Sequence, residues 1–463
     1  MGEFIINFDL KYESDEEERE ERANMEVTPN IATRAVKLTL QELDSIEKSR
    51  HEGNTVKQTS WAVKCFTSWL QERNYLYTNW VSSILETLNS SSLLLGSCPH
   101  SSGNSSGKAK HTSVVFLKTH KTGSSTVQNI LFRFAERHNL TVAMPVSKCH
   151  HMFCYPFPFR AQFVHKNTVP PDVLTNHARL DVAEMRRLMP KDTRFFTILR
   201  EPVAMFESAF SYFRSECKSF QRVPNGSIEE FLRQPQLYYR SKELDSMYAR
   251  NIATFDLGGD KDRPLGDMHY FWRFTRHLED VFSLVMIMEH FDESLVLLRR
   301  LLNWDPEDLV YLKQNMRADE SRKRLQGTLP AKIRTWNWLD AALYDYFNAS
   351  LWRQLEQLGP ACLEHELRLL HEAEDRVMLT CFGTAKPQMK AAGQIRNKEL
   401  KPWQPKGKLS IVGYELPSKN QTLQRAKKGI KDFCIKMIMP ELQYSELLFR
   451  TQPLPKRKGR HRV

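Results

Sequence analysis

The sequence predicts an α/β protein with a P-loop-like fold, in which helices flank a central parallel sheet and a helical or disordered extension precedes it. Three apolar runs, at 114–117, 193–199 and 281–288, are typical of buried parallel strands, which are covered on both faces. The first two lead through a polar loop into a helical pattern, as βα units do. With 463 residues and 41% hydrophobic content, the chain can form one large domain plus an additional segment.

The net charge of +12 at pH 7 indicates anionic partners, such as nucleic acids, acidic glycans or nucleotide phosphates. Charge alone does not choose among these classes. No run of about 18 apolar residues is present, so the sequence predicts no transmembrane helix. The N-terminus also lacks the basic-then-apolar layout of a signal peptide, and on this ground we expect a soluble chain.

The first 111 residues differ in composition from the rest. Residues 1–45 contain an acidic run and are expected to be disordered. Residues 46–95 have apolar positions at helical spacing, which predicts a small helical segment. This segment weakly resembles the helical entry segment of recombinase-derived domains in chromatin-associated proteins. Residues 96–111 are rich in Ser and Gly, which is typical of a flexible linker and places a domain boundary there.

The segment 114–134 (VVFLKTHKTGSSTVQNILFRF) predicts a phosphate-binding loop. A strand is followed by a loop rich in lysine and hydroxyl residues, and the loop leads directly into a helix. The start of such a helix directs unsatisfied N–H groups and a positive dipole end toward a ligand. Gly123 allows the backbone to approach the ligand closely, and Lys121 adds a full positive charge.

This loop is not a Walker A motif, because its lysine precedes its single glycine. The order Lys-Thr-Gly-Ser-Ser-Thr at 121–126 resembles the 5′-phosphosulfate loop of sulfotransferases, which bind 3′-phosphoadenosine 5′-phosphosulfate (PAPS). A polar turn without a ligand is the alternative interpretation. A P-loop kinase is a further alternative, which the missing Walker glycine disfavours.

A second anion site is predicted where the strand 193–199 ends. Arg200 lies at the carboxyl end of this strand, where open α/β sheets bind their ligands, and Pro202 suits the first turn of the helix predicted at 203–213. Ser208 follows within that helix. A strand-end arginine with a serine at this spacing resembles the 3′-phosphate site of sulfotransferases, and a guanidinium can hold a phosphate through two hydrogen bonds.

Further elements follow from shorter patterns. The Cys/His-rich segment 149–154 allows either a disulfide-tied loop, which the aromatic and proline residues after it favour, or a metal site; we expect no metal. Amphipathic patterns predict helical stretches at 181–189, 293–302, 336–347 and 351–370. The basic tail 453–463 is expected to be disordered, and a nuclear-import role for it stays open.

From about residue 111 to residue 452 the sequence resembles the galactose 3-O-sulfotransferase family. The blocks that match, in the family's order, include FLKTHKTGSSTVQNILFRFAERHNLTVAMP, ILREPVAMFESAFSYF, FDESLVLLRRLL, WNWLDAALYDYFNASLW and MPELQY. The resemblance implies a sulfotransferase domain at 112–452 that transfers a sulfuryl group from PAPS to the 3-hydroxyl of terminal β-galactose on glycoproteins or glycolipids. It also implies the Golgi lumen. Family members begin with a signal anchor, which residues 1–110 replace here, so a cytosolic location stays open.

The resemblance assigns roles to particular residues. Lys121 would bridge the 5′-phosphate and the leaving oxygen, and Arg200 with Ser208 would hold the 3′-phosphate. His177 is the first candidate for the general base and His120 the second; a structural histidine bonded to backbone is the alternative for His177. The remaining residues expected to hold the donor are Lys118, Thr119, Thr122, Gly123, Ser124, Ser125 and Thr126.

A different class of function also fits the sequence. The N-terminal helices and the basic tail could belong to a chromatin- or DNA-associated binding protein that keeps an inactive sulfotransferase domain as a scaffold. The phosphate-loop motif and the family blocks favour the enzyme, so nucleic acid is not an expected partner. The acceptor is expected to be a galactose-terminated glycan, and the sequence does not determine the oligomeric state.

Overall fold

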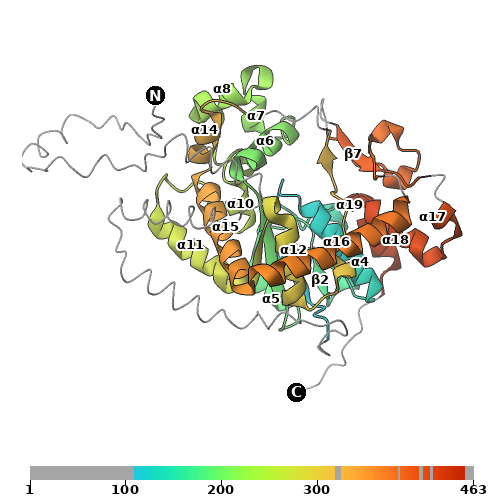
Figure 1. Cartoon of the computed structure of the whole chain (residues 1–463). Coiled ribbons are helices and arrows are strands. Elements are labelled where there is room, and N and C mark those ends of the chain that lie inside the picture. The colour runs from blue at the N-terminus through green and yellow to red at the C-terminus, as the bar shows by residue number, and fades with distance from the viewer. Residues whose placement is uncertain (1–108, 319–324, 384–385, 406–409, 418–420, 454–463) are drawn as a thin grey trace, which may run out of the picture. The chain divides into compact units, whose positions relative to one another are not determined.

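The computed structural model describes residues 109–318, 325–383, 386–405, 410–417 and 421–453 (Figure 1). These residues belong to the second of the chain's two structural units, which comprises residues 93–463. The predictions for the acidic segment, the helical segment and nearly all of the linker and basic tail lie outside the described residues.

A parallel sheet of four strands forms the core, in the order β2-β1-β3-β4. Its strands are β1 (Val114–Leu117), β2 (Val173–Leu174), β3 (Arg194–Leu199) and β4 (Leu284–Ile287). Every residue of β1 and β4 is buried, as expected for strands covered on both faces. The predicted α/β class and parallel sheet are therefore confirmed. Because β1 and β3 are neighbours, the loops that follow them leave the sheet at the same edge.

Two strands differ from the sequence prediction. The apolar run at 281–288 is only partly a strand, because Val281 still belongs to helix α11 (Met268–Val281) and Met288 begins a 3-10 turn. The buried end of a helix and a buried strand are both apolar, so composition cannot separate them. Strand β2 was not predicted, since two residues are too few to show a pattern.

The helices after β3 and β4 agree with the prediction to within two residues, whereas the helix after β1 begins three residues earlier, inside the predicted loop. Helix α4 (Ser124–Arg137) follows the phosphate loop, α6 (Pro202–Tyr212) follows β3, and α12 (Phe291–Leu302) follows β4. Helix α5 (Val182–Leu188) precedes β3, and the Asp181 side chain caps it by accepting a hydrogen bond from the backbone N–H of Glu184.

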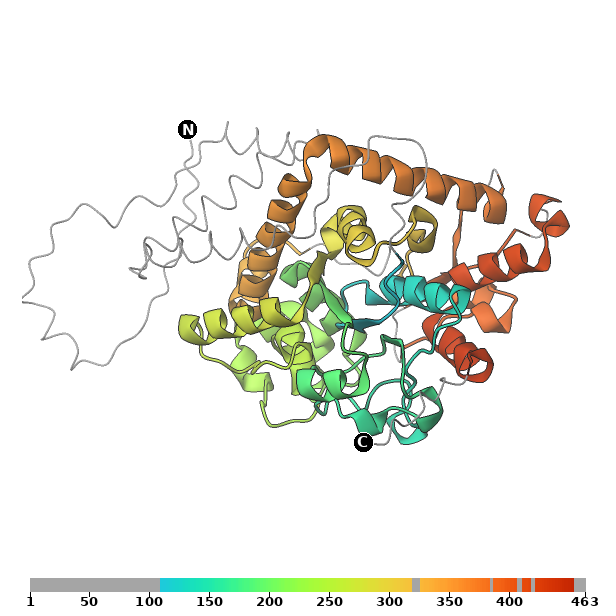
Figure 2. The same cartoon turned by 90° about the horizontal axis from the view of Figure 1, so that it is seen from below.

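The predicted helices at 336–347 and 351–370 have the wrong boundaries. The structure contains α14 (Leu329–Trp336), α15 (Trp338–Leu358) and α16 (Pro360–Phe382). The chain turns at Gly359, whose φ of 87° is favourable only for glycine, and Pro360 then starts the next helix. Figure 2 shows α15 and α16 meeting at a corner beside the sheet.

A second sheet and two C-terminal helices complete the described fold. The antiparallel sheet has the order β5-β7-β6, from β5 (Met316–Arg317), β6 (Met389–Ala391) and β7 (Ile411–Tyr414). Helices α18 (Lys428–Ile438) and α19 (Glu441–Thr451) pack against α4 (Figure 2). The remaining described helices are α7 (Lys218–Gln221), α8 (Ile228–Arg233), α9 (Pro235–Tyr238), α10 (Ile252–Asp256), α13 (Pro306–Leu309) and α17 (Gln421–Arg425).

Disulfide bonds join Cys149 to Cys154 and Cys381 to Cys434. The first confirms the disulfide-tied loop, and it removes both thiolates from any metal site. The second ties α16 to α18. Within the described ranges, no group of three or more His, Cys, Asp or Glu side chains could hold a metal ion. No helix in this part of the chain combines the length and the apolar character needed to cross a membrane.

Candidate active site

The loop between β1 and α4 makes a tight turn at the carboxyl edge of the parallel sheet. Lys121 and Gly123 both have left-handed backbone conformations, with φ of 61° and 75°. A side chain at Gly123 would be strained by this φ, and its Cβ would lie only 2.4 Å from Sδ of Met288. The N–H groups of Ser124 and Ser125 begin α4 and cannot bond within the helix, so the turn presents donors suited to an anion.

Most hydroxyl groups of the loop hold the loop itself. Thr119 donates to the carbonyl of Ile198 on β3 at 2.6 Å, and Ser124 donates to the carbonyl of Thr119 at 2.7 Å. The Thr122 hydroxyl lies 2.8 Å from that of Thr119, and the Thr126 hydroxyl accepts from the Gln314 backbone at 2.9 Å. These hydroxyls therefore shape the turn, and the backbone N–H groups and Lys121 are left to contact a ligand.

The two predicted anion sites meet in space. Arg200, at the end of β3, donates from Nη1 to the backbone carbonyl of Lys121 at 3.0 Å. The Lys121 ammonium lies 3.3 Å from the centroid of the Tyr212 ring, and no carboxylate in the described part of the chain forms an ion pair with it. Burial, together with the charges of Arg317 and Arg200, lowers the pKa of Lys121 well below its usual value. Cationic side chains thus converge at one point of the sheet edge.

Ser208 is buried about two turns into α6, and it makes no hydrogen bond to Lys121 or Arg200. Its neighbour Glu207 binds both guanidinium nitrogens of Arg317, one of them at 3.1 Å. This buried pair links α6 to strand β5 of the second sheet. No sequence pattern predicts this pair, because the two residues lie 110 positions apart.

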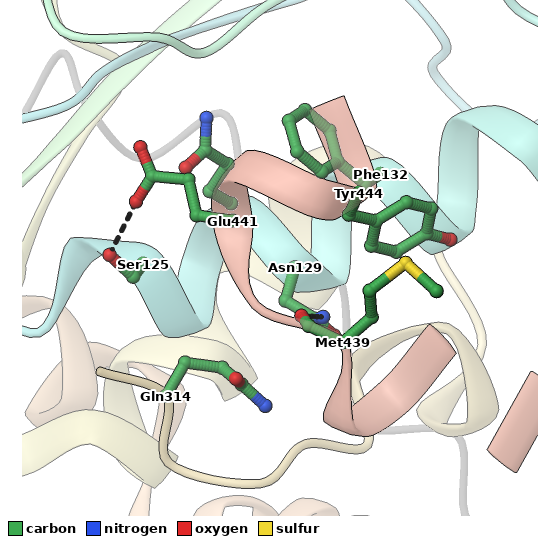
Figure 3. A pocket seen from close by; sticks show the side chains of 8 residues that line it. Ser125, Asn129, Phe132, Gln314, Met439, Glu441 and Tyr444 are labelled. Carbon is green, nitrogen blue, oxygen red and sulfur yellow. Dashed lines mark hydrogen bonds between the residues drawn. The ribbon is translucent and has the colours of Figure 1, made fainter. Parts of the chain in front are cut away.

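Lys118 is paired on the inner side of the loop. Its ammonium lies 2.8 Å from Oε2 of Glu441, which is the first residue of α19, and the same oxygen accepts from the Ser125 hydroxyl at 2.8 Å. Figure 3 shows this carboxylate above Ser125, beside a small pocket between α4 and the C-terminal helices. Burial alone would raise the pKa of Glu441, but Lys118 and Ser125 hold that pKa below its usual value, so the carboxylate stays charged.

Both ring nitrogens of His177 have partners. Nδ1 lies 2.9 Å from the backbone carbonyl of Lys118, and Nε2 lies 3.0 Å from the Lys118 ammonium. Since a carbonyl can only accept, Nδ1 carries the proton and Nε2 accepts from the lysine. Burial, the adjacent His120 and the charge of Lys118 lower the pKa of His177 well below its usual value. His177 is therefore neutral and doubly held.

His120 has one nitrogen held by a carboxylate. Its Nδ1 lies 3.0 Å from Oδ2 of Asp256, which also accepts from the His120 backbone N–H at 2.8 Å. The Tyr155 hydroxyl donates to the other carboxylate oxygen at 2.8 Å. The rings of His120 and His177 stack with centroids 4.0 Å apart. Among the described residues, Nε2 of His120 has no hydrogen-bond partner, so its lone pair can take a proton.

The comparisons with known proteins identify the family of this chain. The model of the family "Galactose-3-O-sulfotransferase" matches residues 60–452. Galactose-3-O-sulfotransferase 3 of Mus musculus is 54% identical over 76% of this chain and 80% of its own length. The chain belongs to the galactose-3-O-sulfotransferase family. The Homo sapiens form of the same relative is 53% identical over 77% of this chain and 81% of its own length. Galactosylceramide sulfotransferase of Mus musculus is 37% identical over 74% and 79%.

Membership of the galactose-3-O-sulfotransferase family confirms the resemblance, and it confirms that this protein is a sulfotransferase enzyme acting on galactose. The alternative of a chromatin-associated protein with an inactive domain gains no support from the comparisons. The family also implies a sulfate donor, and the site fits an anionic one. The positive φ at Gly123, the first N–H groups of α4 and the cations Lys121 and Arg200 all favour a negatively charged group.

Three functional candidates escaped sequence reasoning: Tyr155, Asp256 and Glu441. Asp256 ends the short helix α10 and belongs to no motif, so only its distance to His120 reveals it. Tyr155 directly follows the disulfide-tied loop that ends at Cys154. Glu441 lies in the block MPELQY, which carried the family resemblance, so its acidic side chain was the one signal available.

Proposed function

We propose that this protein transfers a sulfuryl group from PAPS to the 3-hydroxyl of terminal β-galactose on glycoprotein or glycolipid glycans. The observation that carries the proposal is the hydrogen bond from Arg200 to the backbone of Lys121, since it joins the two predicted anion sites into one. A nucleotide with charged groups at both its 3′ and 5′ positions needs two such cations near each other. The names of the relatives support galactose as the acceptor. The two adjacent cations support a nucleotide as the donor.

In this proposal the phosphate loop holds the 5′-phosphosulfate. The N–H groups of Gly123, Ser124 and Ser125 bind its oxygens, and Lys121 stabilises the negative charge that grows on the leaving phosphate oxygen. Arg200 holds the 3′-phosphate, with Ser208 as a second donor from α6. Lys118, Thr119, Thr122 and Thr126 act mainly by keeping the turn in shape. Their contacts with one another and with Ile198, Gln314, Glu441 and His177 support this role.

His120 is the proposed general base, ahead of His177. A galactose hydroxyl is almost fully protonated at neutral pH, and a positioned base contributes about 10²- to 10⁴-fold to such a step. His120 would take the proton at Nε2, while Asp256 at Nδ1 stabilises the imidazolium that forms. The two hydrogen bonds of His177 support a positioning role instead: it holds Lys118 and stacks on His120.

The reaction would proceed in line, with the galactose 3-oxygen attacking sulfur as the bond from sulfur to the phosphate oxygen breaks. As in phosphoryl transfer, the protein mainly positions groups and neutralises charge. No residue cluster among those described calls for a metal ion. The domain limits 112–452 and a Golgi-lumenal location remain part of the proposal; two disulfide bonds support an oxidising compartment.

A labelled-sulfate assay tests the proposal. The full chain is incubated with labelled PAPS and an acceptor panel of lactosamine, a core O-glycan and galactosylceramide, and we expect label on at least one galactose 3-hydroxyl. Linkage analysis of the product checks the position. Absence of label on every galactoside would refute the proposal.

Arg200→Ala tests the donor site by a separate binding measurement. We expect the affinity for adenosine 3′,5′-bisphosphate to fall about 10- to 100-fold, since a charged hydrogen bond is worth about 1.5–3 kcal/mol. Arg214→Ala is the matched control, because Arg214 is exposed and donates to the loop carbonyl of Asn225 rather than to a residue of the site. An unchanged dissociation constant in Arg200→Ala would remove that residue from the donor site. Calorimetry with the full chain provides the measurement.

A further inference from the structure

Trp403 is an exposed tryptophan beside the candidate active site. Its side chain is 47% exposed, whereas the other tryptophans in the described part of the chain are buried or half-buried. An exposed aromatic ring lacks the hydrophobic stabilisation that burial would give it. Such rings are enriched where a protein binds a ligand. Trp403 lies between the second sheet's strands β6 and β7, in a segment that the donor-site assignment leaves without a role.

The backbone on both sides of Trp403 is held in place. The carbonyl of Lys401 accepts a hydrogen bond from Gln443 on α19 at 2.7 Å. The Gln404 side chain bonds both the N–H and the carbonyl of Ile411 on β7, each at 2.9 Å. The exposed ring is therefore carried by an anchored segment, so its exposure is a fixed property of this surface.

The ring of Trp403 is close to the proposed point of transfer. Its centroid lies 6.0 Å from that of Tyr212, with the two ring planes inclined by 46°. The ring of Tyr212 in turn lies 3.3 Å from the Lys121 ammonium. Tyr212 therefore contacts both Trp403 and Lys121, the lysine proposed to stabilise the leaving group. None of the other exposed apolar side chains in the described residues has a recorded ring contact with the active-site residues.

We propose that Trp403, supported by Tyr212, forms an aromatic platform on which the apolar face of the acceptor galactose stacks. In β-galactose the C–H groups of carbons 3, 4 and 5 lie on one face, because the axial 4-hydroxyl points to the other. Polarised C–H groups are attracted to the negative face of an aromatic ring. In glucose the equatorial 4-hydroxyl breaks this arrangement, so the platform also selects galactose.

This inference rests on the proposed function and deepens it by naming the acceptor subsite. The Tyr212 ring contacts the Lys121 ammonium and also lies next to the Trp403 ring. A sugar stacked on Trp403 is therefore presented next to the cation that the transfer needs. Orientation of the 3-hydroxyl in this way is the kind of positioning from which transferases gain rate.

The test uses the full chain and three variants: Trp403→Ala, Trp403→Phe and the control Phe449→Ala. Phe449 is 44% exposed, close to the value for Trp403, and lies on α19 against His165. For Trp403→Ala we expect the KM for lactosamine to rise about 10- to 100-fold, the range of a buried aromatic contact. Trp403→Phe should retain most of the acceptor affinity, and Phe449→Ala should leave it unchanged.

Two further readouts separate binding from a structural effect. The affinity for adenosine 3′,5′-bisphosphate should stay unchanged in Trp403→Ala, and the preference for a galactoside over the matching glucoside should fall. An unchanged acceptor KM, or an equal loss for donor and acceptor, would overturn the inference. So would a fall in molecular mass by light scattering in Trp403→Ala, which would identify the ring as a contact between copies of the chain.

The outcomes also distinguish this inference from the function on which it rests. If the wild-type chain transfers sulfate and Trp403→Ala does so with the same KM, only the platform is refuted. If the wild-type chain sulfates no galactoside, the proposed function is refuted and the platform with it.

Discussion

The two lysines of the phosphate loop are used in opposite ways although they are three residues apart. Lys118 is 1% exposed and paired with Glu441 and His177. Lys121 lies on the Tyr212 ring and, in the described ranges, has no carboxylate partner. We call the group Lys118, Ser125, His177 and Glu441 the paired side, and the group Lys121, His120 and Tyr212 the open side.

The difference separates groups that hold the site from groups that are left to react. On the paired side each charge is already compensated, so a ligand gains little there. On the open side, burial and neighbouring cations lower the pKa of Lys121, and a bound anion would relieve this strain on its charge. The histidines follow the same division, since His177 has both nitrogens occupied and His120 has one available.

The largest effect is expected on the open side, from His120→Ala. Loss of the proposed base should lower kcat about 10²- to 10⁴-fold, while the affinity for adenosine 3′,5′-bisphosphate stays unchanged. Steady-state kinetics with lactosamine and PAPS measure it. Asp256→Asn should lower kcat less and shift the acidic limb of the pH–rate profile, because it changes the charge beside Nδ1.

The exposed His150 provides the control, since His150→Ala should leave kcat unchanged. His177→Ala should cost less than His120→Ala if the two sides differ as described. The opposite ranking would assign the base to His177, the first candidate from the sequence, and would abolish the distinction between the histidines.

The next effect concerns the paired side. Glu441→Gln leaves the Lys118 ammonium without its counter-charge, and we expect the free energy of unfolding to fall by about 2–3 kcal/mol. Breaking a fully buried pair costs about 3–5 kcal/mol, and the Glu441 side chain retains 17% exposure. Urea denaturation provides the measurement. Adenosine 3′,5′-bisphosphate should stabilise this variant more than the wild type, since the freed lysine attracts an anion.

Glu446→Gln is the matched control on the same helix, because Glu446 forms an exposed pair with Arg450 and should change stability by less than about 0.5 kcal/mol. Equal stability of Glu441→Gln and the wild type would show that the ion pair of Lys118 contributes nothing to the free energy of unfolding. The distinction between the paired side and the open side would then be wrong.

The smallest effect is a pH dependence. The folded-state pKa of His177 lies below the unfolded value of about 6.5, so below that pH the unfolded chain binds a proton that the native state does not. Stability should therefore fall as the pH drops from about 6.5 toward 5, by up to about 1.4 kcal/mol per pH unit for this group. Urea denaturation across pH 5–7.5 checks it, and His177→Gln should flatten the slope. Identical slopes in both proteins would contradict the assignment.

The sequence predicted the parts of the fold that have a local signature. The strands β1 and β3, the turn at Gly123 and the helices after both strands follow from apolar runs and from the order of loop residues. Boundaries that depend on packing were less accurate. The break at Gly359 was missed because the amphipathic pattern continues on both sides of it, and β4 was merged with the buried end of α11.

By itself, the sequence determined that two strands each end beside a cationic residue and lead into a helix, because strand, loop and helix follow one another along the chain. Only the tertiary structure decided which of those groups are compensated. Glu441 reaches Lys118 from 323 positions away, and Asp256 reaches His120 from 136 positions away. Hydrogen bonds and ion pairs depend on distances of a few ångströms, and the separation of residues along the chain does not report such distances.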